Sequence, residues 1–363
     1  MDARTSRPDR RADGPAGRPD EIRISNLATY WPVAPVDLLV WTPLVARLLL
    51  GASPLARGVQ AAMLGLYVGS AFTDWRDRRG IRRIAFRQEF GADARHLVPM
   101  PPEARQAEVA ALVARLNDAL VPERLPRREV AVRAERHLTE YIAGITGQRV
   151  HSSAEVRGFA LVSLACPWAL GACDVLSGDV AIFRDTGFFE PHIIAHEFSH
   201  RKGYWKELEA QALAYLALAA SGEPVFVQSA LLERLHRDLR VLAGGDEAAF
   251  DRLVAGAGLR PELRHALRTL RPPSGPVGRR VGAGMRRVYE ARLRLSGQNG
   301  LSDYDLGFTD FLHTFETSPD ARQTPPPAGA MHQRPTPSPG PPGARCGAHR
   351  SGPSPGDRPG RPV

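Results

Sequence analysis

The segment His196-Glu197-Phe198-Ser199-His200 combines residue types that can hold a metal ion and use it. Histidines four positions apart project from one face of an α-helix, close enough for both imidazoles to bind the same ion. Glu197 lies one step round that helix, where its carboxylate can accept a proton from a metal-activated water molecule. The pattern predicts a Zn²⁺ site for metal-assisted hydrolysis, with His196 and His200 as ligands and Glu197 as general base.

A third protein ligand is expected from the next helical segment, because catalytic zinc usually takes three protein ligands and leaves one position for water. Glu207 and Glu209 are the two carboxylates in the first turns of the segment 205–216. They lie about 200° apart around a helix, so only one of them can face the ion. Glu207 shares its face with Ala210 and Ala214, which allow close packing on the histidine helix. Glu207 is therefore the predicted ligand and Glu209 the reserve candidate.

Three other side chains are considered for the site. His192 precedes His196 by one turn, and packing or capping explains it better than ligation. His236 and Tyr304 could reach a substrate oxyanion, as side chains of zinc peptidases do. A surface helix with two histidines and a glutamate but without any metal is the alternative interpretation of the whole motif.

Helices are expected to make up most of the structure that positions this motif. Apolar residues recur every three or four positions over 102–120 and 123–145, as in amphipathic helices. Short β-rich runs bounded by Gly and Asp predict strands at 156–162 and 178–183. Further helical segments follow His200, near 205–220, 225–243, 247–256, 261–270, 279–295 and 303–316. The predicted fold class is α+β and predominantly α-helical.

Two apolar runs, 35–51 and 58–73, predict a helical hairpin. Each is at the short end of what crosses a bilayer of about 30 Å, and the first contains Asp37, Pro43 and Arg47. Aromatic residues lie near the ends of the runs, and five arginines follow between positions 76 and 83, as at a membrane interface. These features favour a transmembrane hairpin over a buried soluble one, with the arginines on the cytoplasmic side.

Composition shifts predict the division of the chain. Residues 1–29 and 318–363 lack apolar periodicity and are rich in Pro, Gly and Arg, so they are expected to be a disordered leader and a disordered tail. The hairpin occupies 30–83, a helical subdomain 84–150 and the zinc domain 151–317. The net charge of +9 comes without an aromatic-interleaved basic patch, and nucleic-acid binding is not expected.

Cys166 and Cys173 are close in sequence and could form a disulfide if this part faces an oxidising compartment. Two small buried thiols are the simpler interpretation. The third cysteine, Cys346, lies in the predicted tail, so no disulfide framework is implied.

The motif and its surroundings resemble a bacterial family of membrane-anchored zinc peptidases of unknown function, the domain of unknown function 3810. The core of that family reads HExxH-x-x-G, then E-x-E-A-N and a Y-L run. Here the matching stretches are His196–Gly203, Glu207–Gln211 and Tyr215-Leu216. Residues 32–39 resemble the family's entry to a membrane helix, and 296–304 resemble its closing G-Q…G-x-x-S-Y signature. The likeness covers roughly residues 30–316.

The resemblance implies a gluzincin-like domain with a peptide or protein substrate. The first glutamate of an E-x-x-A-D/N sequence is the common third ligand in such peptidases, which selects Glu207. Arg201 and Lys202 stand where these enzymes usually carry uncharged residues, and Gln211 replaces the Asn or Asp expected to orient the metal ligands. The resemblance also implies a catalytic domain outside the cytoplasm, whereas the arginine distribution predicts the opposite side of the bacterial membrane.

The sequence as a whole predicts a zinc-dependent, membrane-anchored metallopeptidase. In this reading His196, His200 and Glu207 bind Zn²⁺, and Glu197 acts first as a base toward water and then as an acid toward the leaving amine. The alternative is a catalytically inactive, zinc-stabilised membrane scaffold or partner-binding protein.

Overall fold

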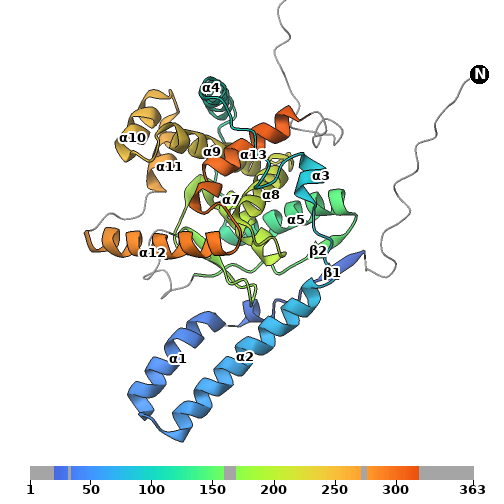
Figure 1. Cartoon of the computed structure of the whole chain (residues 1–363), viewed down its shortest axis with the longest axis vertical. Helices are drawn as coiled ribbons and strands as arrows, with labels where there is room; N and C mark the ends of the chain where they lie inside the picture. The colour runs from blue at the N-terminus through green and yellow to red at the C-terminus, as the bar shows by residue number, and fades with distance from the viewer. Residues whose placement is uncertain (1–19, 32–33, 159–168, 271–275, 319–363) are drawn as a thin grey trace, which may run out of the picture. The chain divides into compact units, whose positions relative to one another are not determined.

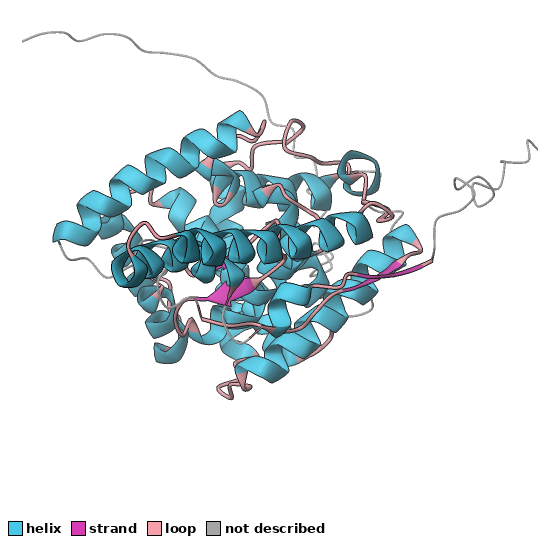
Figure 2. Cartoon of the chain, turned by 90° about the horizontal axis from the view of Figure 1, so that it is seen from below, coloured by secondary structure: helices cyan, strands magenta, loops and turns pink. Residues whose placement is uncertain are grey.

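The computed structural model describes residues 20–31, 34–158, 169–270 and 276–318. Most of these residues are helical, which confirms the prediction of a predominantly helical protein with few strands (Figure 1, Figure 2). The α-helices are α1 (Pro35–Leu50), α2 (Pro54–Arg78), α3 (Phe86–Phe90), α4 (Pro102–Asp118), α5 (Arg127–Thr146), α7 (Glu190–Arg201), α8 (Glu207–Ala219), α9 (Pro224–Leu242), α10 (Glu247–Gly256), α11 (Pro261–Thr269), α12 (Pro276–Leu295) and α13 (Leu306–Thr317). The short helical turns are η1 (Leu27–Tyr30), η2 (Gly187–Phe189) and η3 (Leu301–Asp303).

Four short strands form two small sheets. β1 (Glu21–Arg23) pairs in parallel with β2 (Arg149–His151), so that Ile22 lies opposite Val150. β3 (Gly171–Cys173) pairs antiparallel with β4 (Val180–Ile182). The predicted strand at 178–183 contains β4, whereas β1, β2 and β3 were not predicted.

Two sequence predictions need correction or restriction in this region. Residues 21–23 were assigned to a disordered leader, but they form β1 because Ile22 and Ile24 pack with Ile81 and Val150 in a small core of their own. Of the strand predicted at 156–162, Arg157 forms a bridge with Ala181. Residues 159–162 lie outside the described part of the chain.

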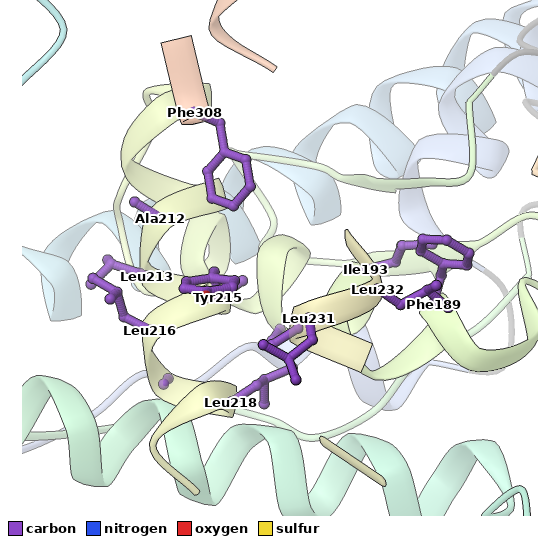
Figure 3. Close-up of a cluster of buried hydrophobic side chains, with 14 of the residues drawn as sticks. Phe189, Ile193, Ala212, Leu213, Tyr215, Leu216, Leu218, Leu231, Leu232 and Phe308 are labelled. Atoms are coloured by element: carbon purple, nitrogen blue, oxygen red, sulfur yellow. The ribbon is translucent and has the colours of Figure 1, made fainter. Parts of the chain in front are cut away.

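The main hydrophobic core is built around α7 and α8. Every residue of α7 and 11 of the 13 residues of α8 are buried. Figure 3 shows part of this core, in which Leu213 and Tyr215 of α8 lie with Leu231 and Leu232 of α9 and with Phe308 of α13. Burying each large apolar side chain contributes roughly 1.5–3 kcal/mol. The segment that carries the HExxH motif is therefore the most enclosed part of the described fold.

This core also takes in the helices that precede the motif. Leu112 of α4 and Leu138 of α5 belong to the same buried cluster as Phe198 of α7 and Phe311 of α13. Their periodic apolar residues face inward, as the spacing over 102–120 and 123–145 indicated. The residues assigned to a helical subdomain and to a zinc domain thus share one hydrophobic core.

Helices α1 and α2 pack against each other as the predicted hairpin. Ser53 begins α2, where its Oγ accepts a hydrogen bond from the Ala56 amide, and Pro54 occupies the first turn. Large apolar side chains on the hairpin are exposed, among them Leu48 at 84% and Leu49 at 77%. Within the described ranges, no helix combines the length and the apolar character needed to span a membrane.

The C-terminal part of α2 is joined to the motif helix through polar contacts. Asp74 accepts hydrogen bonds from the backbone and side-chain amides of Asn26, and Arg78 Nε donates to the Arg201 carbonyl at 3.0 Å. Gly178 lies against these side chains with φ +68°. A Cβ at Gly178 would come within 2.8 Å of Asn26, Arg78 and Asp74, so only glycine fits there.

Candidate metal centre

Three buried side chains converge at the junction of α7 and α8. The imidazole rings of His196 and His200 lie one turn apart on α7, with centroids 4.8 Å apart and planes at 86°. Glu207 is the first residue of α8, and its Oε2 atom is 3.3 Å from His196 Nε2 and 3.2 Å from His200 Nε2. One ligand atom from each residue lies within 4.8 Å of the others, a group that could bind a metal ion.

A tight turn brings Glu207 back toward the two histidines. Gly203 takes φ +97°, a conformation that glycine adopts at low cost, and the Tyr204 amide donates to the Ser199 carbonyl at 3.0 Å. His200 Nδ1 lies 2.8 Å from the Tyr204 carbonyl oxygen, which can only accept a proton. Nδ1 therefore carries the proton, and the neutral ring presents the Nε2 lone pair to Glu207 and to any ion.

The charges of these groups favour a cation between them. Burial disfavours the ionised Glu207 carboxylate, but the two imidazoles outweigh this effect and hold its pKa well below its usual value. Burial likewise disfavours the His200 cation, while the charge of Glu207 acts in the opposite direction and raises the His200 pKa to about 9. The pocket thus stabilises positive charge at the point where the three ligand atoms meet.

Glu197 is buried beside this group. Its burial raises its pKa, an effect that His196 and His200 partly oppose. β3 passes along the carboxylate, because a Cβ placed on Gly171 would lie 3.1 Å from Glu197 Oε1 and 3.2 Å from the Ala181 carbonyl oxygen. A residue without a side chain at position 171 therefore leaves room for the Glu197 carboxylate.

Residues near the end of the described chain close the other side of the centre. The Glu207 amide donates to Gln298 Oε1 at 2.8 Å, which satisfies one of the free amides at the start of α8. The Tyr304 ring lies 6.0 Å from the His196 ring, centroid to centroid. Tyr289 of α12 donates from its hydroxyl to Glu207 Oε1 at 2.7 Å. The segment 296–304, which was selected from its sequence signature, thus contributes directly to the surroundings of Glu207.

The reserve candidates occupy different places. Glu209 forms a surface ion pair with Lys206 at 2.7 Å and faces away from the two imidazoles. Gln211 donates to Glu233 Oε1 at 2.6 Å. His236 packs edge-on against Phe189 and Phe250, and burial lowers its pKa to about 4. The structure therefore brings Glu207, and not Glu209, to His196 and His200.

A buried ionic network beside the centre was not predicted from the sequence. Glu233 and Arg237 of α9 form an ion pair at 2.7 Å, and Arg237 also binds Asp305 at 2.8 Å. The guanidinium of Arg237 lies 5.8 Å from the centre of the Tyr304 ring. The only sequence signal was the i,i+4 spacing of Glu233 and Arg237, which surface helices commonly show. Tyr289 gave no signal at all.

Arg201 and Lys202 were placed beside the metal ligands by the sequence analysis, and that placement is wrong. Both side chains are fully buried and point to other parts of the fold. Arg201 donates to the carbonyls of Gly178, Glu155 and Ser153. Lys202 donates to Glu135 at 2.8 Å, to Thr139 at 2.7 Å and to the Val150 carbonyl. These two cations hold loops and strand β2 against α7, and they leave the metal ligands unchanged.

The cysteines give a partial outcome. Cys173 lies in β3 as a half-buried free thiol, and burial raises its pKa. Cys166 lies outside the described residues, so the predicted alternative of a disulfide stays a prediction.

Comparison with known proteins gives one match. A family model described as "Protein of unknown function (DUF3810)" matches residues 186–312, a range that contains α7 to α12, all three candidate ligands and Tyr304. No curated protein and no solved structure matches the chain. Residues 30–185, which the sequence resemblance also included, lie before the matched range. The part of the chain that carries the candidate metal centre is thus similar to the DUF3810 family of proteins of unknown function.

Proposed function

We propose that this protein is a zinc-dependent hydrolase that acts on peptide bonds. The observation that carries the proposal is the buried convergence of His196 Nε2, His200 Nε2 and Glu207 Oε2, with Glu197 beside them. Two imidazole nitrogens and one carboxylate oxygen form a ligand set found in catalytic zinc sites, and three ligands leave one position for water or substrate.

The residues present fit a zinc ion. The His200 tautomer fixed by the Tyr204 carbonyl offers Nε2 as a lone pair, and the Glu207 carboxylate supplies the negative charge that a dication requires. His196 Nδ1 is a buried nitrogen without a hydrogen-bond partner in the described structure, so the ring is free to adopt the tautomer that presents Nε2. Bound zinc would supply Lewis-acid activation of a carbonyl and of water.

Glu197 is the proposed proton carrier. Its carboxylate takes a proton from the attacking water and delivers it to the nitrogen of the leaving amine, so that the peptide bond breaks without releasing a free amide anion. Burial beside Gly171 raises the pKa of this carboxyl, which makes it a better base than an exposed glutamate. Tyr304, whose ring lies beside His196, is the proposed hydrogen-bond donor to the carbonyl oxygen as charge develops on it.

The experiment compares wild type with Glu197→Gln after loading with Zn²⁺. We expect about one zinc per chain in both proteins, and cleavage of unstructured peptides by wild type that falls about 10² to 10⁴-fold in the variant. Glu209→Gln is the matched control, because Glu209 is a glutamate of the same region paired with Lys206. Peptide products are followed by mass spectrometry and zinc by elemental analysis.

Two results would contradict the proposal in different ways. Wild type that binds zinc and cleaves none of the peptides would favour the inactive, zinc-stabilised scaffold. Wild type without stoichiometric zinc after reconstitution would eliminate the metalloenzyme.

We further propose that the hairpin α1–α2 places the protein in a bacterial membrane. Its exposed apolar side chains form a set that water would not favour, namely Leu44, Val45, Leu48, Leu49, Leu50, Leu55, Leu64, Leu66, Val68, Phe72 and Trp75. Arg79 stacks on Trp75 with 3.8 Å between the guanidinium carbon and the ring centre, a pairing suited to the headgroup layer. Flotation of the full chain with phosphatidylglycerol vesicles tests this, and a double variant Leu48→Glu, Leu49→Glu should stay in the unbound fraction.

A further inference from the structure

We propose that Tyr289 is the positioning residue that fixes Glu207 as a metal ligand through one oxygen, an inference that rests on the metal centre proposed above. The two carboxylate oxygens of Glu207 have different surroundings. Oε2 lies 3.3 and 3.2 Å from the Nε2 atoms of His196 and His200, whereas Oε1 accepts the Tyr289 hydroxyl at 2.7 Å. One oxygen faces the ligand histidines, and the other is held by the phenol.

The direction of the hydrogen bonds is set by the number of protons. A phenol carries a single proton, and a carboxylate can only accept, so Tyr289 donates to Glu207. The Tyr289 oxygen can then accept from Tyr304, whose hydroxyl lies 3.2 Å away. The resulting chain runs from Tyr304 through Tyr289 to Glu207. Two linked donors resist rotation of the carboxylate more strongly than one would.

Neighbouring residues fix where Tyr289 lies. The adjacent Glu290 carboxylate accepts from the Leu301 amide at 2.6 Å, and Leu293, one turn further along α12, is buried. Gly300 has φ +90°, and a Cβ there would overlap the Glu290 carboxylate. This part of α12 is thus fastened to the turn that leads into Tyr304, which places the Tyr289 hydroxyl at Glu207.

The consequence concerns how many positions around an ion remain open. A carboxylate that binds through both oxygens occupies two coordination positions, and one that binds through a single oxygen occupies one. By engaging Oε1, Tyr289 keeps Glu207 to one position and preserves an open one. Groups that orient a metal ligand in this way typically change metal affinity 10 to 100-fold when they are removed.

The test replaces the hydroxyl alone, with Tyr289→Phe in the full chain. We expect Zn²⁺ affinity, measured by competition with a zinc-binding dye, to fall about 10-fold. With Co²⁺ in place of zinc, the visible absorption should weaken as the coordination number rises from four to five. Tyr67→Phe is the matched control, because Tyr67 also donates to a carboxylate, Asp174, at 2.9 Å, and it should leave both measurements unchanged.

Gly300→Ala provides a second route, since it displaces Glu290 and so moves Tyr289 without changing any group at Glu207. It should reproduce the cobalt spectrum of Tyr289→Phe. Equal Zn²⁺ affinity and an unchanged cobalt spectrum in Tyr289→Phe would overturn the inference, whatever the hydrolytic activity. Weaker binding and an altered spectrum would support it even if wild type cleaves no peptide, in which case only the proposed hydrolysis fails.

Discussion

Helix α7 carries two buried polar regions that differ in how their hydrogen-bonding groups are satisfied. At its C-terminal end, which we call the anchor, Arg201 and Lys202 donate to carbonyl, hydroxyl and carboxylate oxygens of the chain. In the metal centre, two imidazole nitrogens share a single carboxylate oxygen of Glu207, and His196 Nδ1 has no partner in the described structure. Buried polar groups are nearly always satisfied, so the first pattern indicates structure and the second indicates a ligand from outside the chain.

The largest effect expected from this difference is on folding, at Arg201. Arg201→Met removes a fully buried guanidinium and leaves the carbonyls of Gly178, Ser153 and Glu155 without their donor. We expect the free energy of unfolding of the zinc-free protein to fall by about 3–5 kcal/mol. Urea denaturation followed by circular dichroism measures it. Arg252→Met, at an exposed ion pair with Asp246, is the control and should cost at most about 0.5 kcal/mol.

A somewhat smaller loss is expected at Lys202. Lys202→Met leaves the Glu135 carboxylate with one donor fewer, and we expect a fall of about 2–4 kcal/mol in the free energy of unfolding. Glu135→Gln in the same background should cost much less than it does in wild type, because the two side chains are coupled. Additive losses in this double-mutant cycle would show that the pair is not the origin of the effect.

The Lys202 effect should depend on pH. Burial alone would raise the pKa of Glu135, but Lys202 outweighs it and the net pKa lies below the ordinary value of 4.5. Stability from a carboxyl with a lowered pKa is present above the unfolded-state pKa and is lost as the pH falls through the folded-state value. The stability difference between wild type and Lys202→Met should therefore be constant above about pH 5 and shrink below pH 4.5.

Substitution in the metal centre should have the opposite character. His200→Ala removes a ligand and one hydrogen bond to the Tyr204 carbonyl, so the zinc-free protein should lose only about 1–2 kcal/mol of stability. The variant should nevertheless fail to retain stoichiometric zinc, and added Zn²⁺ should no longer raise its melting temperature as it does for wild type. A variant that unfolds like Arg201→Met would break the distinction between the two regions.

The smallest effect is expected at Glu209, which belongs to neither region. Its side chain pairs with Lys206 at the surface, where ion pairs contribute roughly 0–1 kcal/mol. Glu209→Gln should leave zinc content unchanged and shift the free energy of unfolding by less than about 0.5 kcal/mol. Loss of zinc in this variant would reverse the assignment of Glu207 as the third ligand.

The parts of the site that follow from local spacing could be predicted from the sequence. His196, Glu197 and His200 fall within one helical turn and a half, and Glu207 was selected over Glu209 by helical geometry alone. The α-helices followed from the 3.6-residue period of their apolar residues. These predictions needed no knowledge of how distant segments meet.

The remaining features depend on contacts between residues far apart in the chain. Tyr289 reaches Glu207 across 82 positions, and β1 pairs with β2 across more than a hundred. Arg201 and Lys202 were misplaced because a charged residue beside a motif has the same identity whether it faces the metal or the opposite side of the helix. Only the packing of β2 and the loop at 153–155 against α7 decides between the two.

The complete burial of α7 has a consequence for how such a protein changes over evolutionary time. A helix without a single exposed position offers no site at which a substitution is silent, since each residue either packs, anchors or faces the metal centre. The exposed apolar side chains of the hairpin are under no comparable steric restriction. We therefore expect relatives to be recognisable through the segment around α7 long after their N-terminal hairpins have diverged, and the family match begins at residue 186, four positions before α7.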